Sequence, residues 1–345
     1  MKERIQWIDT AKFLGIFAIY LGHFGDVMGN AYYFVFLYHV PLFFFISGCL
    51  CNYDKKSDFI GYGIKKFQLL LLPLWGFGIV SIILKCLAGL IKGDFHISFA
   101  KDMLGQLLKG CIRNHFVAGS LWFLSCLFLV EILFKLIRYA KYRWMIAVIC
   151  LVIYCAVEKF LSPHPLASPS GIYNWDSALY YLIFYASGYL AYPWISQLFT
   201  LGSRIKKVIF FVTGGLAFVY SALIYLGRDG ISPLMETIPG VGIFLPVIKP
   251  LVIIWLNLVV SKLLEKIEFL NQIGRETLFL CGNEYLIKNV LPYALTLFGA
   301  GQFLLSPFTT FLYTFILLVI GTKLLIPCEK KVIALVLNRF KRCKD

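Results

Sequence analysis

Hydrophobic residues occupy long uninterrupted runs of this chain, and polar residues gather in the shorter segments between them. Ten such runs can be marked, at approximately 7–25, 33–50, 69–91, 118–138, 144–160, 177–198, 208–227, 241–260, 273–297 and 304–326. A helix that crosses a bilayer needs about 20 apolar residues, and most runs approach that length. The runs are continuous rather than alternating, which argues against a β-barrel. The pattern predicts an all-α, polytopic membrane helix bundle with about ten transmembrane helices.

The composition supports a membrane protein and excludes several other classes. Of the 345 residues, 60% are hydrophobic and 15% are charged, whereas soluble domains have about 45–50% apolar and about 25% charged residues. A soluble globule or a disordered chain is therefore excluded. We expect one transmembrane domain over residues 1–345, with the lipid bilayer as its main partner. The ten cysteines form no C-x-x-C pair, so no metal site is predicted.

The basic residues are distributed as in a membrane protein of defined orientation. The formal net charge is +15, which in a soluble protein would suggest nucleic acid as a partner. Here the lysines and arginines lie in loops, so nucleic acid is not an expected partner. Alternate loops are rich in Lys and Arg, which mark cytoplasmic loops. We expect both termini to be cytoplasmic, and we expect a short basic tail over residues 327–345 to lie on the inner leaflet.

The first apolar run contains three ionisable residues, Asp9, Lys12 and His23. Ionisable groups within a membrane span are costly, so each requires a partner or a function. Asp9 lies one helical turn from Lys12 and can pair with it. Lys12 and His23 are eleven positions apart, which places them on one helix face about 16 Å apart along the axis. An ion pair that anchors the helix end and a histidine satisfied within the bundle are the alternatives without a catalytic role.

A second histidine, His39, lies in the outer half of the next run and therefore at a depth similar to that of His23. Two imidazoles at one level on neighbouring helices indicate a site that handles protons. Pro41 follows closely and is expected to bend this helix. Ser47, beside Gly48, is interpreted as a helix-packing residue rather than a nucleophile.

The chain resembles the membrane acyltransferase-3 family, which includes bacterial O-acetyltransferases of sugars and cell-envelope glycans such as fucose 4-O-acetylase-like enzymes. The resemblance covers nearly the whole chain. It is carried by Lys12 and His23, by His39-x-Pro-Leu-Phe-Phe-x-Ile-Ser-Gly, by Lys65-Lys66 before Pro73, by Leu121-Trp122-Phe123-Leu124 and by Gly274-x-x-Thr-Leu. Two positions depart from the family pattern. Lys12 replaces a residue that is often arginine, and Glu284 stands where many members have histidine.

The resemblance implies transfer of an acyl group, usually acetyl, from cytoplasmic acyl-CoA to a hydroxyl of a sugar or glycan at a bacterial cell membrane. Acetyl-CoA would be a co-substrate, with no tightly bound cofactor. The catalytic candidates are His23, His39, Asp9 and Lys12, with His23 as general base or transient acyl carrier.

The same resemblance gives further residues candidate binding roles. Lys65, Lys66 and Lys12 would contact the phosphates of CoA, and Trp122 and Glu284 would contact the acceptor. Each of these side chains also has an ordinary interpretation: lysines that only orient the protein, a core tryptophan, and a glutamate paired with Lys288 one turn away. The alternative function is a transporter or flippase of an envelope precursor.

Overall fold

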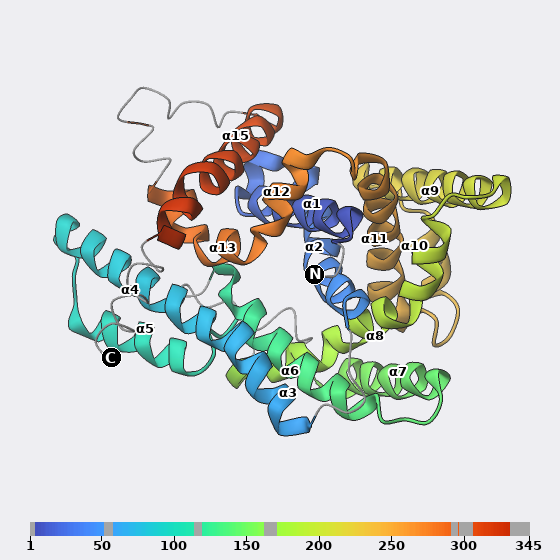
Figure 1. Ribbon diagram of the computed structural model, residues 1–345, viewed down its shortest axis with the longest axis horizontal. Coiled ribbons are helices and arrows are strands. Elements are labelled where there is room, and N and C mark those ends of the chain that lie inside the picture. The colour runs from blue at the N-terminus through green and yellow to red at the C-terminus, as the bar shows by residue number, and fades with distance from the viewer. Residues whose placement is uncertain are drawn as a thin grey trace. The chain divides into compact units, whose positions relative to one another are not determined.

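The computed structural model describes residues 4–51, 58–113, 119–161, 171–290, 296 and 306–331. Every regular element among these residues is a helix (Figure 1), as the apolar pattern predicted. Six helices are long and apolar enough to cross a membrane: residues 30–49, 59–91, 119–137, 204–225, 242–264 and 307–331. The chain is thus a multi-pass membrane protein, while the expected total of ten spans and the orientation of the termini stay predictions.

The helices group into two compact units, the first comprising residues 1–36 and 260–345 and the second residues 37–259. The elements of the first unit are α1 (Gln6–Gly22), η1 (Gly25–Met28), α12 (Glu268–Arg275), α13 (Thr277–Gly282), η6 (Leu286–Val290), α15 (Pro307–Ile320) and η8 (Gly321–Leu325). Helix α2 (Asn30–Cys49) continues from the first unit into the second, and α11 (Leu245–Leu264) runs from the second into the first. The first unit therefore joins the beginning of the sequence to its last quarter.

Within the first unit, α12 packs tightly against α1 at a glycine. A Cβ atom on Gly274 would lie 1.8 Å from the carbonyl oxygen of Asp9, so only glycine allows the two backbones to approach this closely. Buried Thr10 donates a hydrogen bond to Asn271 Oδ1 (2.7 Å), and the Asn271 amide in turn donates to the Glu265 carbonyl (2.7 Å). The beginning of α1 is thereby fixed to the segment that leads into α12.

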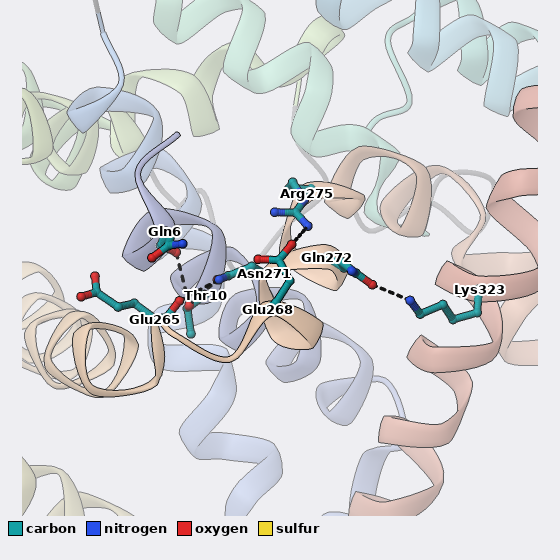
Figure 2. Close-up of polar contacts among 8 residues, drawn as sticks. All are labelled: Gln6, Thr10, Glu265, Glu268, Asn271, Gln272, Arg275 and Lys323. Atoms are coloured by element: carbon teal, nitrogen blue, oxygen red, sulfur yellow. Dashed lines mark hydrogen bonds and ion pairs between the residues drawn. The ribbon is translucent and has the colours of Figure 1, made fainter. Parts of the chain in front are cut away.

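Figure 2 shows the polar contacts that residues of α12 make within the helix and with its neighbours. Arg275 forms an ion pair with Glu268, and Lys323 donates a hydrogen bond to Gln272. The hydrogen bond from Arg275 holds the pKa of Glu268 below its ordinary value. Helix α12 is thus a short amphipathic helix, with Asn271, Ile273 and Gly274 buried and its charged residues toward the outside.

The second unit contains the remaining long helices. Its elements are α3 (Phe59–Lys66), η2 (Phe67–Leu71), α4 (Leu72–Lys92), α5 (Ile97–Leu108), η3 (Gly119–Leu121), α6 (Trp122–Ile137), α7 (Arg143–Phe160), η4 (Ile172–Asn174), α8 (Trp175–Leu198), α9 (Arg204–Tyr225), α10 (Ile231–Glu236) and η5 (Gly242–Phe244). Helices α2 and α8 meet at Gly48 and Gly188, where an added Cβ atom would lie about 2 Å from a carbonyl oxygen of the facing helix. Ser47 adjoins this close contact, which agrees with its interpretation as a packing residue.

One predicted span has a different form from the others. The apolar run expected over 273–297 contains the end of α12, then α13 and the π-helical η6, rather than one continuous helix in its described part. The breaks fall at Glu276 and Asn283, each within two residues of a glycine (Gly274 and Gly282), and the low helix propensity of glycine and asparagine is consistent with them. The expected basic tail begins within the helix that ends at Lys331, and residues 332–345 lie outside the described part of the chain.

Candidate active site

Asp9 and Lys12 lie near the beginning of α1, as the sequence predicted. The Lys12 ammonium is 3.9 Å from Asp9 Oδ1, a loose ion pair at positions i and i+3. Asp9 is buried, while about a quarter of the Lys12 side chain is exposed. The contact with Gly274 fixes the backbone of Asp9. Lys12 is therefore held beside a buried carboxylate and keeps access to its surroundings.

His23 lies at the opposite end of the same helix. It is the residue at which α1 ends, and its backbone N–H donates to the carbonyls of Ile19 and Tyr20 (3.2 Å each). Its imidazole Nδ1 lies 2.6 Å from Oε1 of Glu284, and 30% of the His23 side chain is exposed. A histidine that meets a carboxylate through one nitrogen and remains partly accessible can exchange a proton with a substrate.

Glu284 is the residue that the structure brings to His23 from far along the sequence. Only 6% of its side chain is exposed, and the Lys288 ammonium lies 3.2 Å from its Oε1. The predicted pair with Lys288 is thus present, and the same carboxylate oxygen also contacts His23. Tyr20, one turn before His23, donates a hydrogen bond to the Leu280 carbonyl (2.8 Å), which attaches α13 to the end of α1. The sequence did not indicate that Glu284 and His23 meet.

His39 lies in α2 within the second unit and is buried, with 6% of its surface exposed. It has an interaction partner in the described structure. The predicted relation between His39 and His23 stays a prediction, because the two histidines belong to different units.

Lys65 and Lys66 differ sharply in their surroundings, although they are adjacent in α3. Lys65 is exposed. The Lys66 ammonium lies 2.6 Å from Oε1 of Glu131, a buried carboxylate on α6. Glu131 also accepts hydrogen bonds from the hydroxyls of Tyr62 and Tyr185, the latter at 3.0 Å. Lys66 therefore has a structural partner, and Lys65 is the lysine of the pair that is accessible to a ligand.

Sequence reasoning missed Glu131, although a signal was available. A carboxylate inside an apolar run is costly and requires a cation. Lys135, one turn further along α6, is also buried and lies 5.3 Å from the Tyr62 ring centroid. An Asp/Glu residue followed by Lys at i+4 in an apolar helix indicates such a polar cluster.

Trp122 begins α6 beside a buried arginine. The guanidinium carbon of Arg113 lies 5.9 Å from the Trp122 ring centroid, and the Tyr181 ring lies 6.1 Å from it. The Trp122 carbonyl accepts a hydrogen bond from the Asn174 amide (3.3 Å). Trp122 is half-buried in this setting, which suits packing in the core and leaves part of the ring available for stacking. In the described residues, no group of three or more His, Cys, Asp or Glu side chains could hold a metal ion.

Comparison with known families decides the class of protein. The family model described as an acyltransferase domain, Acyl_transf_3, matches residues 5–326. The chain belongs to this acyltransferase family. The match spans α1 with His23, the segment with Glu284 and all of α15, and it includes residues of both compact units.

The family assignment confirms the resemblance found in the sequence and makes the protein a membrane acyltransferase. It does not support the alternative of a transporter. No curated protein and no solved structure matches the chain significantly.

Proposed function

We propose that this acyltransferase moves an acyl group, expected to be acetyl, from cytoplasmic acyl-CoA to a hydroxyl of a sugar or cell-envelope polysaccharide, as in fucose 4-O-acetylase-like enzymes. Its site of action is the bacterial cell membrane, with both termini in the cytoplasm. The observation that carries the proposal is the contact of His23 Nδ1 with the buried carboxylate of Glu284 at 2.6 Å. In an acyltransferase, a partly exposed histidine with such a partner suits a general base.

The reaction is an ordinary transfer between a thioester and an alcohol. His23 accepts the proton of the acceptor hydroxyl, and the hydroxyl oxygen attacks the thioester carbonyl carbon. The carbon–sulfur bond then breaks, and His23 returns the proton to the departing CoA thiolate. Each turnover leaves the enzyme unchanged and produces an ester and free CoA, so the reaction requires no oxidant or reductant.

The donor approaches from the end of α1 that carries Lys12. The eleven positions from Lys12 to His23 span about 16 Å along the helix, a distance comparable to the pantetheine arm of CoA. Lys12 and the exposed Lys65 then offer positive charge to the CoA phosphates, and Asp9 positions Lys12. Lys66 contributes less, because its ammonium is already bound to Glu131.

The acceptor approaches His23 from the other side of the membrane. Trp122 provides an aromatic face on which a sugar ring can stack. His39 orients the acceptor hydroxyl or passes on the proton. Trp122 and His39 are therefore candidates for acceptor specificity, because both are proposed to contact the acceptor and neither has to contact acyl-CoA.

The proposal is tested with purified protein in lipid vesicles, supplied with radiolabelled acetyl-CoA and with mono- or oligosaccharide acceptors. We expect acceptor-dependent release of free CoA together with labelled ester in the glycan. A transporter would instead exchange labelled substrate across the vesicle without cleaving a thioester. Counterflow of a glycan precursor without CoA release would contradict the proposal.

A further inference from the structure

One carboxylate oxygen in the first unit lies between two groups that can carry positive charge. Oε1 of Glu284 is 2.6 Å from His23 Nδ1 and 3.2 Å from Lys288 Nζ. Exposure falls from His23 (30% of the side chain) through Lys288 (17%) to Glu284 (6%). The carboxylate is thus the inner member of the group, and the imidazole is the member that meets the surroundings.

This arrangement selects one form of the His23 ring. A neutral imidazole has one nitrogen that donates and one that accepts, and a hydrogen bond fixes which is which. A carboxylate can only accept, so Nδ1 carries the proton in the contact with Glu284. Nε2 then has a free lone pair, which is the atom that a general base requires.

The other titratable groups near His23 have different engagements. Tyr20 on α1 donates its hydroxyl proton to the Leu280 carbonyl. Asp26 on η1 is exposed. On α15, Tyr313 packs its ring edge-on against Phe24, with ring centroids 6.1 Å apart. Cys281 on α13 is buried near Tyr20. Among the described residues, only Glu284 is recorded within ion-pair distance of the His23 ring.

We propose that Glu284 is the positioning residue of His23 in the acyl transfer proposed above, and that Lys288, bound to the same carboxylate oxygen, is a second charged neighbour of His23. This inference rests on the proposed function for its kinetic consequences. Glu284 holds Nδ1–H, turns Nε2 toward the acceptor hydroxyl, and stabilises the imidazolium that forms when Nε2 takes the hydroxyl proton. Lys288 opposes the imidazolium by its own charge, so the two neighbours act on His23 with opposite sign.

Glu284 and Lys288 should change the properties of His23 in opposite directions. Purely structural roles for these residues would not produce opposite changes, so the proposal can be tested. The variants E284Q, E284D and K288Q are made in the full chain, and acyl transfer is measured across pH in lipid vesicles. E284Q removes the negative charge and offers either an amide oxygen or an amide nitrogen to Nδ1, so part of the population adopts the unproductive ring form. We expect a fall in kcat of about 10²- to 10⁴-fold, with little change in the KM of either substrate.

The pH dependence separates the two neighbours. On the acid side, the pH at which the rate falls to half should decrease in E284Q and increase in K288Q, by about one pH unit. E284D should restore part of the rate and shift the profile less than E284Q. A matched control is E265Q, which breaks the ion pair of Glu265 with Lys262 (2.5 Å). Glu265 lies near Asn271 and Thr10, toward the opposite end of α1 from His23, so E265Q should change neither kcat nor the pH profile.

A second measurement does not depend on turnover. In protein labelled with ¹⁵N-histidine, the His23 signals are assigned by their loss in H23Q. We expect Nδ1 to be the protonated nitrogen of the neutral ring in the wild type, and a mixture of both forms in E284Q. The inference is overturned if the Nε2-protonated form dominates in the wild type, or if E284Q and K288Q move the rate profile in the same direction. Absence of acyl transfer by the wild type, with the expected ring form intact, would contradict the proposed function and leave the positioning contact standing.

Discussion

The contact between α1 and α12 predicts a large effect from one added methyl group. In Gly274→Ala, the new Cβ atom would lie 1.8 Å from the Asp9 carbonyl oxygen, whereas Cβ atoms in proteins do not approach other atoms within 3.0 Å. The two backbones must therefore separate by about 1.2 Å. Neither atom belongs to a flexible side chain, so rotation about a side-chain bond cannot relieve the clash.

The loss of folding stability in G274A can be estimated from the neighbouring contacts. Overpacking of this kind costs about 1–3 kcal/mol. The same separation would stretch the Thr10–Asn271 hydrogen bond from 2.7 Å beyond bonding distance, and unpaired buried polar groups cost about another 1–3 kcal/mol. We expect G274A to lower the free energy of unfolding of the first unit by about 2–6 kcal/mol, and also to reduce acyl transfer by displacing Asp9 and Lys12.

Thermal and denaturant unfolding of the purified protein in detergent measures this effect. The matched control is Gly215→Ala in α9, where nothing lies within 4 Å of the added Cβ atom. That substitution should be neutral or stabilise the protein by about 0.4–1 kcal/mol. If G274A were as stable as G215A and retained full activity, the close approach of α12 to α1 would be refuted.

Three further predictions concern the second unit and the orientation. K66Q leaves the buried Glu131 carboxylate without its lysine and should destabilise the protein by about 3–5 kcal/mol. K65Q should leave stability unchanged and raise the apparent KM for acyl-CoA, more strongly at low salt. If the KM rose only in K66Q, and that variant were correctly folded, the two assignments would be reversed. Burial alone would raise the pKa of Asp229, but hydrogen bonds from Ser232 and Lys249 outweigh it and hold that pKa below its ordinary value of 3.8. Its contribution to stability is therefore present above about pH 4 and is lost as the pH falls through the lowered pKa, so thermal unfolding scans between pH 5 and pH 2.5 should show less acid sensitivity in D229N than in the wild type. A reporter fused to the C-terminus should give a cytoplasmic signal, and an external signal would mean an odd number of spans.

The sequence predicted the helical class because apolar runs of bilayer length leave few other solutions. It also predicted the Asp9–Lys12 pair, because residues three apart on one helix are neighbours whatever surrounds them. Both predictions depend only on the local sequence within a single helix. The breaks between α12, α13 and η6 were not predicted, since a run with scattered Gly and Asn residues has the same mean hydropathy whether it is straight or broken.

Contacts between distant helices lie beyond what periodicity can specify. Glu284 lies 261 positions after His23, and only the packing of α13 on α1 brings the two side chains together. From the sequence alone, Glu284 could contact the acceptor or pair with Lys288, and the structure places it in contact with both His23 and Lys288. In the same way, the different surroundings of Lys65 and Lys66 depend on Glu131, a residue on another helix that the pattern of loop charges does not include.

Acyl transfer by a His23→Ala variant tests the central claim most directly. The variant and a His96→Ala control are reconstituted in lipid vesicles with labelled acetyl-CoA and a glycan acceptor, after equal membrane insertion has been verified. His96 precedes α5 and is exposed, so its loss should leave the rate unchanged. If His23 is the general base, H23A should lose about 10²–10⁴-fold in rate while H96A retains wild-type activity. A rate in folded H23A equal to that of H96A would contradict the account.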